Sequence, residues 1–300
     1  MADPLLLLPD FVLIVVGWLI CRHTALKRPV WDSVERLVYY FLFPALLFYA
    51  IVRNPLQPMA ALPLAACGLA IVGTGIVLAH AVGRLRGVDA RLHASGSQTA
   101  FRFNSYVALA LSERLAGTAG VAWTALLLAV CVPLCNVAAV WPLARQGGHR
   151  TFGELARNPL ILSTAGGLVC NLLGLKLPDV VATTLARVGA AALPLGLMAV
   201  GAGLQLGALR EAPLLAALFM TIRHAVLPLL AVGLVLWLAL PPAQQAVIVA
   251  FAALPTASSA YVLAVRMGGH GGFVAGLVTL STLIAMAGLP VALALLRALA

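Results

Sequence analysis

Long apolar stretches recur along the whole chain, and short polar connections separate them. Each stretch is close to the roughly 20 apolar residues that a helix needs to cross the hydrocarbon core of a bilayer. Ten stretches qualify: residues 5–22, 33–52, 60–82, 95–112, 118–143, 159–175, 180–203, 213–238, 243–266 and 273–297. The pattern predicts an all-α integral membrane protein with ten transmembrane helices and no inserted soluble domain.

The composition favours the same class of protein. Of the 300 residues, 63% are hydrophobic and 9% are charged, whereas a soluble domain is about half apolar and about a quarter charged. The net charge is +10, but most Lys and Arg residues lie between apolar blocks and no aromatic stacking platform accompanies them. They therefore indicate membrane topology and lipid contacts, and no nucleic-acid binding is expected.

The distribution of positive charge predicts the orientation in the membrane. If the N-terminus lies outside the cytoplasm, 12 of the 19 Lys and Arg residues fall in inside connections and 4 fall outside. Cytoplasmic loops carry such an excess. We therefore expect a multi-pass protein of the cell (inner) membrane with both termini outside the cytoplasm.

The two halves of the chain share proline, glycine and tyrosine positions. At offsets of 150 and 155 residues the matching pairs are Pro9 with Pro159, Pro44 with Pro194, Pro63 with Pro213, Gly17 with Gly167, Gly83 with Gly233 and Tyr106 with Tyr261. Five helices per repeat is an odd number, so the second copy is inverted, as in many secondary transporters. We predict a first repeat over residues 1–143, a cytoplasmic linker over 144–158 and a second, inverted repeat over 159–300.

The fourth and ninth stretches are the candidates for broken helices. Residues 95–106 are too polar for a helix that faces lipid, and Pro255 removes a backbone donor in the middle of the ninth stretch. A kinked helix whose Ser and Thr side chains bond to its own carbonyls is the alternative for each. Their correspondence in the repeat favours a pair of discontinuous crossover helices, near which transporters bind their substrates.

Two arginines lie deep in the predicted spans. Arg102 is about seven residues and Arg223 about ten residues into its stretch, which places both near the middle of the bilayer. An arginine at that depth is costly and indicates a function, such as binding a carboxylate. The alternative is that Arg102 snorkels or bonds a carbonyl, and Arg223, beside His224, has a similar alternative. Arg187 is shallow enough for a structural role.

No carboxylate holds a clear midplane position, which argues against a proton relay. A Na⁺ site made of backbone carbonyls and hydroxyls is still compatible with the sequence.

Several short motifs, in order, resemble the auxin efflux carrier family over nearly the full length. They are Phe43-Pro44-Ala45-Leu46-Leu47-Phe48, Asn104-Ser105-Tyr106, Pro133-Leu134-Cys135-Asn136, Pro255-Thr256-Ala257, Tyr261-Val262-Leu263-Ala264 and Met267-Gly268-Gly269. The resemblance implies a scaffold domain from helices 1, 2, 6 and 7 and a transport domain from helices 3–5 and 8–10. It also implies helices 4 and 9 crossing at the substrate site, elevator-like motion, a homodimer, and substrates such as auxin, malonate or malate. The long central loop of some plant members is absent, which favours the compact bacterial-type form.

The resemblance also implies a set of substrate-binding residues. Asn104 would contact substrate through its amide and Tyr106 would line the pocket, while the other crossover would offer the hydroxyls of Thr256, Ser258 and Ser259. Arg102 as the carboxylate partner follows from its charge and depth. The remaining candidates are Ser105, Pro255 and Tyr261. Arg223 and Asn136 are further candidates, and the alternative for Asn136 is that it caps or bridges helices. Relatives often carry a proline where this chain has Val107-Ala108-Leu109-Ala110, so the first crossover is expected to be either less sharply broken or held open by the preceding polar run.

These observations predict a secondary active transporter of a small organic anion, an auxin-like compound or a mono- or dicarboxylate. Coupling to protons or Na⁺ is open. The alternatives are a Na⁺-coupled symporter like the bile-acid transporters, a passive channel and an intramembrane enzyme. The sequence contains no HExxH, GxSxG or acidic metal-binding pair and no CxxC, so neither an enzyme activity nor a metal or cofactor is predicted.

Overall fold

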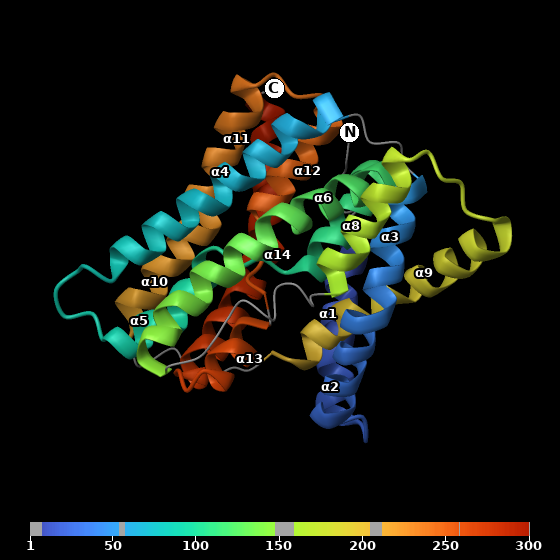
Figure 1. The fold of residues 1–300 in the computed structure, drawn as a ribbon. Helices are drawn as coiled ribbons and strands as arrows, with labels where there is room; N and C mark the ends of the chain where they lie inside the picture. Colours follow the sequence, from blue (N-terminus) through green and yellow to red (C-terminus); the bar gives the residue numbers. More distant parts are fainter. Residues whose placement is uncertain (1–7, 54–57, 148–158, 205–211, 258, 300) are drawn as a thin grey trace. The chain divides into compact units, whose positions relative to one another are not determined.

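The computed structural model describes residues 8–53, 58–147, 159–204, 212–257 and 259–299, and these residues are almost entirely helical (Figure 1). Helix is present in each of the ten predicted stretches. Among the described residues, six helical segments are long and apolar enough to cross a membrane: Arg28–Arg53, Leu62–Val82, Ser105–Leu143, Asp179–Ala202, Pro213–Trp237 and Gly271–Leu299. The all-α membrane class is confirmed, while ten crossings and the inverted relation of the halves stay predictions.

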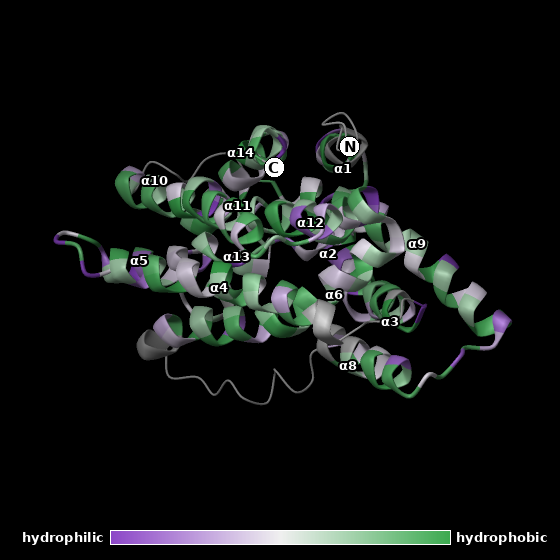
Figure 2. Cartoon of the chain, turned by 90° about the horizontal axis from the view of Figure 1, so that it is seen from above, coloured by the Kyte–Doolittle hydropathy of each residue, from purple (hydrophilic) through white to green (hydrophobic). Residues whose placement is uncertain are grey.

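The hydropathy of the helices fits this class. In Figure 2 the helices are coloured mostly as hydrophobic, and strongly hydrophilic colour marks connections such as the one between α4 (Pro58–Val82) and α5 (Ala90–Gly96). On α4 the apolar side chains of Leu62, Leu69 and Val77 are exposed. In a membrane protein such side chains contact lipid, so their exposure carries no penalty there.

The chain forms two compact units. Unit 1 comprises Met1–Ala65, Tyr106–Ala129 and Ala156–Gly203, and unit 2 comprises Ala66–Ser105, Val130–Leu155 and Leu204–Ala300. The helices of unit 1 are α1 (Leu8–His23), α2 (Arg28–Leu37), the π-helical η2 (Val38–Leu42), α3 (Phe43–Arg53), α8 (Pro159–Leu172) and α9 (Asp179–Ala202). Within it, α1 packs against α9, and α3 packs against α8 and α9. The predicted assignment of whole helices to a scaffold and a transport domain stays a prediction.

Unit 2 contains most of α4 together with α5, the 3₁₀ turn η3 (Ser97–Ala100), α10 (Pro213–Thr221), the π-helical η5 (Ile222–Val226), α11 (Leu227–Trp237), α12 (Pro242–Ala252), α13 (Ser259–Arg266) and α14 (Gly271–Leu299). The segments α10, η5 and α11 follow one another without a gap and make one long helix with a π-bulge. The remaining element, α6 (Ser105–Gly147), contributes residues to both units.

The element α6 consists of two helical segments joined by a kink at Ala116 and Gly117. Ala116 and Gly117 have non-helical backbone angles, and Gly117 has a φ of 58°, which favours glycine. The hydroxyls of Ser112 and Thr124 are hydrogen-bonded to each other. Twelve residues of straight helix span about 18 Å, so this contact requires the chain to turn back at Gly117. The fourth and fifth stretches are therefore separate helical segments, as predicted.

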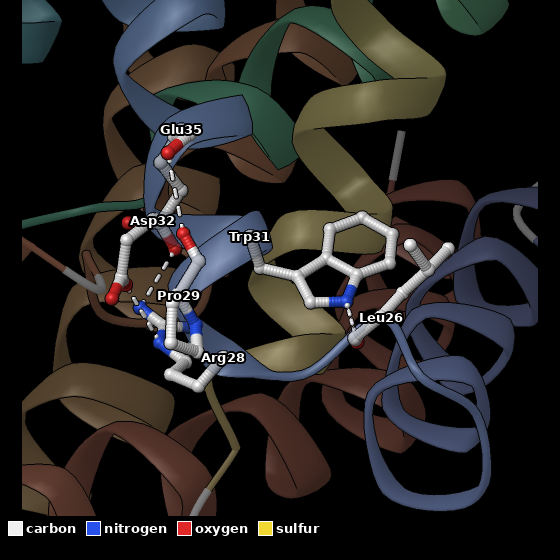
Figure 3. Close-up of polar contacts among 7 residues, drawn as sticks. Leu26, Arg28, Pro29, Trp31, Asp32 and Glu35 are labelled. Carbon is white, nitrogen blue, oxygen red and sulfur yellow. Dashed lines mark hydrogen bonds and ion pairs between the residues drawn. The ribbon is translucent and has the colours of Figure 1, made fainter.

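Polar contacts fix the start of α2 in unit 1 (Figure 3). Arg28 Nε lies 2.9 Å from Asp32 Oδ1, and Arg28 Nη2 lies 3.1 Å from Glu35 Oε1. The indole N–H of Trp31 donates to the Leu26 carbonyl at 3.0 Å. Arg28 thus pairs with both carboxylates, and the helix begins at Arg28 with Pro29 in its first turn, ahead of the apolar stretch that starts at residue 33.

Two glycines bring the backbones of α1 and α9 together. A Cβ added at Gly201 would overlap the carbonyl of Ile14, and one added at Gly17 would overlap the backbone of Met198. Small residues allow such close approach between membrane helices. The α1–α9 contact therefore depends on the absence of side chains at these positions.

Gly201→Ala is expected to lower the stability of the protein by about 1–3 kcal/mol, the usual cost of overpacking. The matched control is Gly233→Ala in α11, where an added Cβ meets no atom within 4 Å. Thermal unfolding in detergent should show a lower midpoint for Gly201→Ala and an unchanged or higher one for Gly233→Ala, because alanine favours helix. Equal midpoints for the two variants would mean that the α1–α9 contact is looser than the structure indicates.

Candidate functional site

The first break lies between α5 and α6. Helix α5 ends at Gly96, η3 follows, and residues 101–104 belong to no helix. The side chains of Ser97, Gln98 and Thr99 are fully buried. Thr99 Oγ1 donates to the Gly96 carbonyl at 2.7 Å, and Gln98 Nε2 donates to the Ser95 carbonyl at 3.1 Å. The fourth stretch is thus interrupted without a proline. Side chains of the polar run donate hydrogen bonds to carbonyls that would accept from backbone N–H groups in a regular helix.

Close packing explains why the first break follows Gly96. A Cβ added there would lie 2.7 Å from the ring of Phe273 on α14 and 2.9 Å from that of Phe219 on α10. Only a glycine lets α5 end against these two rings. Asn104 stands directly before α6, and asparagine is among the residues preferred at the N-cap of a helix.

The second break lies between α12 and α13. Helix α12 ends at Ala252, residues 253–257 belong to no helix, and α13 begins at Ser259. Pro255 lies in the middle of this segment and is buried. Pro255 has no N–H to continue the hydrogen bonds of α12, and this is the reason for which the break was predicted.

The two breaks cross and hydrogen-bond to each other within unit 2. Phe103 and Thr256 form an antiparallel bridge. The N–H of Asn104 donates to the Pro255 carbonyl at 2.9 Å, and the N–H of Ala257 donates to the Arg102 carbonyl at 3.4 Å. Each break therefore satisfies backbone groups of the other, as non-helical backbone at membrane depth requires.

Side chains complete the crossing. Thr256 Oγ1 donates to the Thr99 carbonyl at 2.6 Å, the rings of Phe103 and Phe251 lie 4.5 Å apart, and Cys135 Sγ on α6 donates to the Phe101 carbonyl at 3.6 Å. All of these residues belong to unit 2. The crossing is thus a structure internal to one compact unit.

Positive charge is concentrated at the crossing. Arg102 Nη2 donates to Ser259 Oγ at 3.1 Å. Arg223, which is 1% exposed, donates through Nε to the Leu254 carbonyl at 2.7 Å. In the described part of unit 2 the carboxylate side chain is that of Asp89, which accepts the Leu92 N–H at 2.8 Å and caps α5. The crossing therefore presents guanidinium groups in a region poor in carboxylates, which favours an anionic ligand.

The structure brings most of the predicted site residues to this crossing. Asn104 is 2% exposed, Pro255 and Thr256 are buried, Ser105 is the half-buried first residue of α6, and Ser259 is the exposed first residue of α13. Asn136 is half-buried on α6 and follows Cys135. Ser258 lies outside the described residues.

The two candidate tyrosines have other surroundings. Tyr106 belongs to unit 1, where its ring lies 4.6 Å from that of Phe43 and a Cβ added at Gly196 would come within 3.0 Å of it. Tyr261 packs against the apolar cluster of Ala260, Ala264, Val274 and Val278 between α13 and α14. A contact of either side chain with substrate stays a prediction.

Ser281, which the sequence did not single out, takes part in the site. Ser281 Oγ on α14 accepts the N–H of Thr256 at 2.8 Å, and it lies 2.8 Å from His224 Nε2. Ser281 stands in an apolar helix where a serine normally bonds to its own preceding turn. The residues around Ser281 in the sequence do not distinguish it from a serine that bonds within its own helix.

Long apolar helices with two discontinuous helices crossing in a positively charged region are typical of membrane transporters. Residues 148–293 match the family model described as "Membrane transport protein", the domain of the auxin efflux carrier family. This match agrees with the resemblance seen in the motifs and covers the second half of the chain, including the second break. Curated proteins of known function gave no match to the chain.

Proposed function

We propose that the chain is a secondary active transporter of a small organic anion. The observation that carries the proposal is the guanidinium of Arg102, held on Ser259 Oγ at the crossing of the two broken helices. Two helices, α6 and α13, begin at this crossing. Their N-terminal ends carry partial positive charge, which adds to the attraction that Arg102 exerts on a carboxylate.

The proposed substrate carries at least one carboxylate, as auxin-like compounds and mono- and dicarboxylates do. Arg102 would pair with the carboxylate, and the amide of Asn104 would hydrogen-bond to the same ligand. The scarcity of acidic side chains in the described part of unit 2 supports an anion over a cation. Among the described residues, no group of three or more His, Cys, Asp or Glu side chains is arranged to hold a metal ion.

The transport mechanism that we propose is elevator-like alternating access. Every residue of the crossing belongs to unit 2, and a site carried inside one compact unit can move as a rigid body. Unit 2 would correspond to the transport domain and unit 1 to a scaffold that forms a homodimer. The protein would lie in the cell membrane with both termini outside the cytoplasm. Transport would be coupled to protons or Na⁺.

Counterflow in proteoliposomes tests the proposed function. Vesicles containing the purified protein and loaded with unlabelled malonate, malate or an aromatic carboxylate should accumulate the labelled compound transiently, with saturable kinetics. Protein-free vesicles are the control, and imposed proton or Na⁺ gradients identify the coupling ion. Uptake that increases linearly with concentration and shows no counterflow would indicate a channel and contradict the proposal.

A further inference from the structure

Two consecutive polar residues interrupt the long apolar helix of α10 and α11. Arg223 and His224 lie in the π-bulge η5. A π-bulge inserts one residue into a helical turn and occurs frequently at functional sites. In unit 2 this bulge directs both side chains to partners at the second break.

Arg223 reaches the peptide on the N-terminal side of Pro255. Its Nε donates to the carbonyl of Leu254 at 2.7 Å, and its side chain is 1% exposed. Leu254 lies two residues beyond the last residue of α12. The guanidinium therefore stands near the C-terminal end of α12, where the helix dipole favours a cation.

His224 reaches the peptide on the C-terminal side of Pro255 through Ser281. Ser281 Oγ accepts the N–H of Thr256 at 2.8 Å and lies 2.8 Å from His224 Nε2. Since the serine oxygen is already an acceptor, its own hydrogen can bond to His224 Nε2, which requires the neutral tautomer protonated at Nδ1. The neighbouring Thr282 instead donates to Val278 in its own helix at 2.9 Å.

We propose that the π-bulge is a clamp that holds the second break open, with Arg223, His224 and Ser281 as positioning residues. The clamp fixes one peptide group on each side of Pro255 and thereby the segment that pairs with the first break. In this assignment Arg223 acts on the backbone of the site and is not the ligand of the substrate carboxylate. The consequence for transport rests on the function proposed above, whereas the clamp itself can be tested without substrate.

Hydrogen exchange of the full-length protein in detergent tests the clamp directly. Ser281→Ala removes the acceptor of the Thr256 N–H, so exchange in the segment 253–261 should become roughly tenfold faster, as expected for the loss of one hydrogen bond. Thr282→Val is the matched control, because the Thr282 hydroxyl bonds to Val278 within α14, and exchange in segment 253–261 should equal that of the wild type. Unchanged exchange in Ser281→Ala would overturn the clamp.

Arg223 variants test the other side of the clamp with malonate as the probe. Arg223→Met should weaken malonate binding about tenfold, and Arg223→Lys, which keeps a cationic donor, should restore it to within about threefold. Equal loss in both variants, with wild-type exchange in segment 253–261, would overturn the positioning role. If malonate and the other carboxylates fail to bind the wild type while Ser281→Ala still exchanges faster, the clamp stands and the anion assignment fails.

Discussion

Replacing Asn104 with alanine is expected to reduce transport sharply at low substrate concentration while leaving membrane insertion intact. The backbone N–H of Asn104, not its side chain, donates to the Pro255 carbonyl, so this bond of the crossing survives the substitution. What is lost is a buried amide at the proposed site. A hydrogen bond to a charged group contributes about 1.5–3 kcal/mol, so affinity for a carboxylate should fall about ten- to a hundredfold.

The control for this variant is Asn171→Ala in unit 1. Asn171 Nδ2 donates to the Ile51 carbonyl at 2.6 Å. This variant also removes a side-chain amide, but one that bonds to the backbone of another helix in unit 1. Asn171→Ala should lower the melting temperature and leave the KM for uptake near the wild-type value. Normal uptake by Asn104→Ala in proteoliposomes would remove Asn104 from the site.

Arg102→Gln is expected to weaken anion affinity more than Arg187→Gln does. Arg102 lies in the first break and donates to Ser259 Oγ, whereas Arg187 is an exposed residue of α9 in unit 1. Losing the charged partner of a carboxylate should raise the KM by about tenfold or more. Arg102→Lys should lie between the wild type and Arg102→Gln, because lysine keeps the charge but not the planar fork.

These variants are best compared by initial rates of uptake over a range of substrate concentrations. A larger effect of Arg187→Gln than of Arg102→Gln would show that the depth of an arginine in its span is a poor guide to its role. An effect of Arg102→Gln on the maximal rate with an unchanged KM would assign Arg102 to the motion of the carrier, not to anion recognition.

The sequence predicted the helices and the two interruptions because each follows from local properties. Apolar length sets the spans, Pro255 breaks one helix by removing a donor, and the run from Ser95 to Asn104 is too polar to face lipid. The absence of a proline after Tyr106 left the first break open to two interpretations. The structure resolves this, because bonds from Thr99 and Gln98 and the pairing with residues 255–257 replace the missing helical bonds.

The partners at the crossing could not be predicted in the same way. Thr256 and Thr99 are 157 residues apart, and a bond across that separation depends on how segments distant in the sequence pack together. The same applies to Arg223, whose depth suggested a ligand for substrate but whose Nε is bound to the Leu254 carbonyl. The position of an arginine within a predicted span shows that its charge is buried. Only the fold shows which group the arginine contacts.

Thermal stabilisation of the purified protein by a panel of carboxylates tests the central claim most directly. A ligand that binds the folded state raises the melting temperature, by about 2.7 kcal/mol of added stability at a hundred times its Kd. We predict a shift with malonate, malate or an aromatic carboxylate that disappears in Asn104→Ala and is reduced in Arg102→Gln. No shift with any anion, or shifts with cations or neutral solutes alone, would contradict an anion site at the crossing.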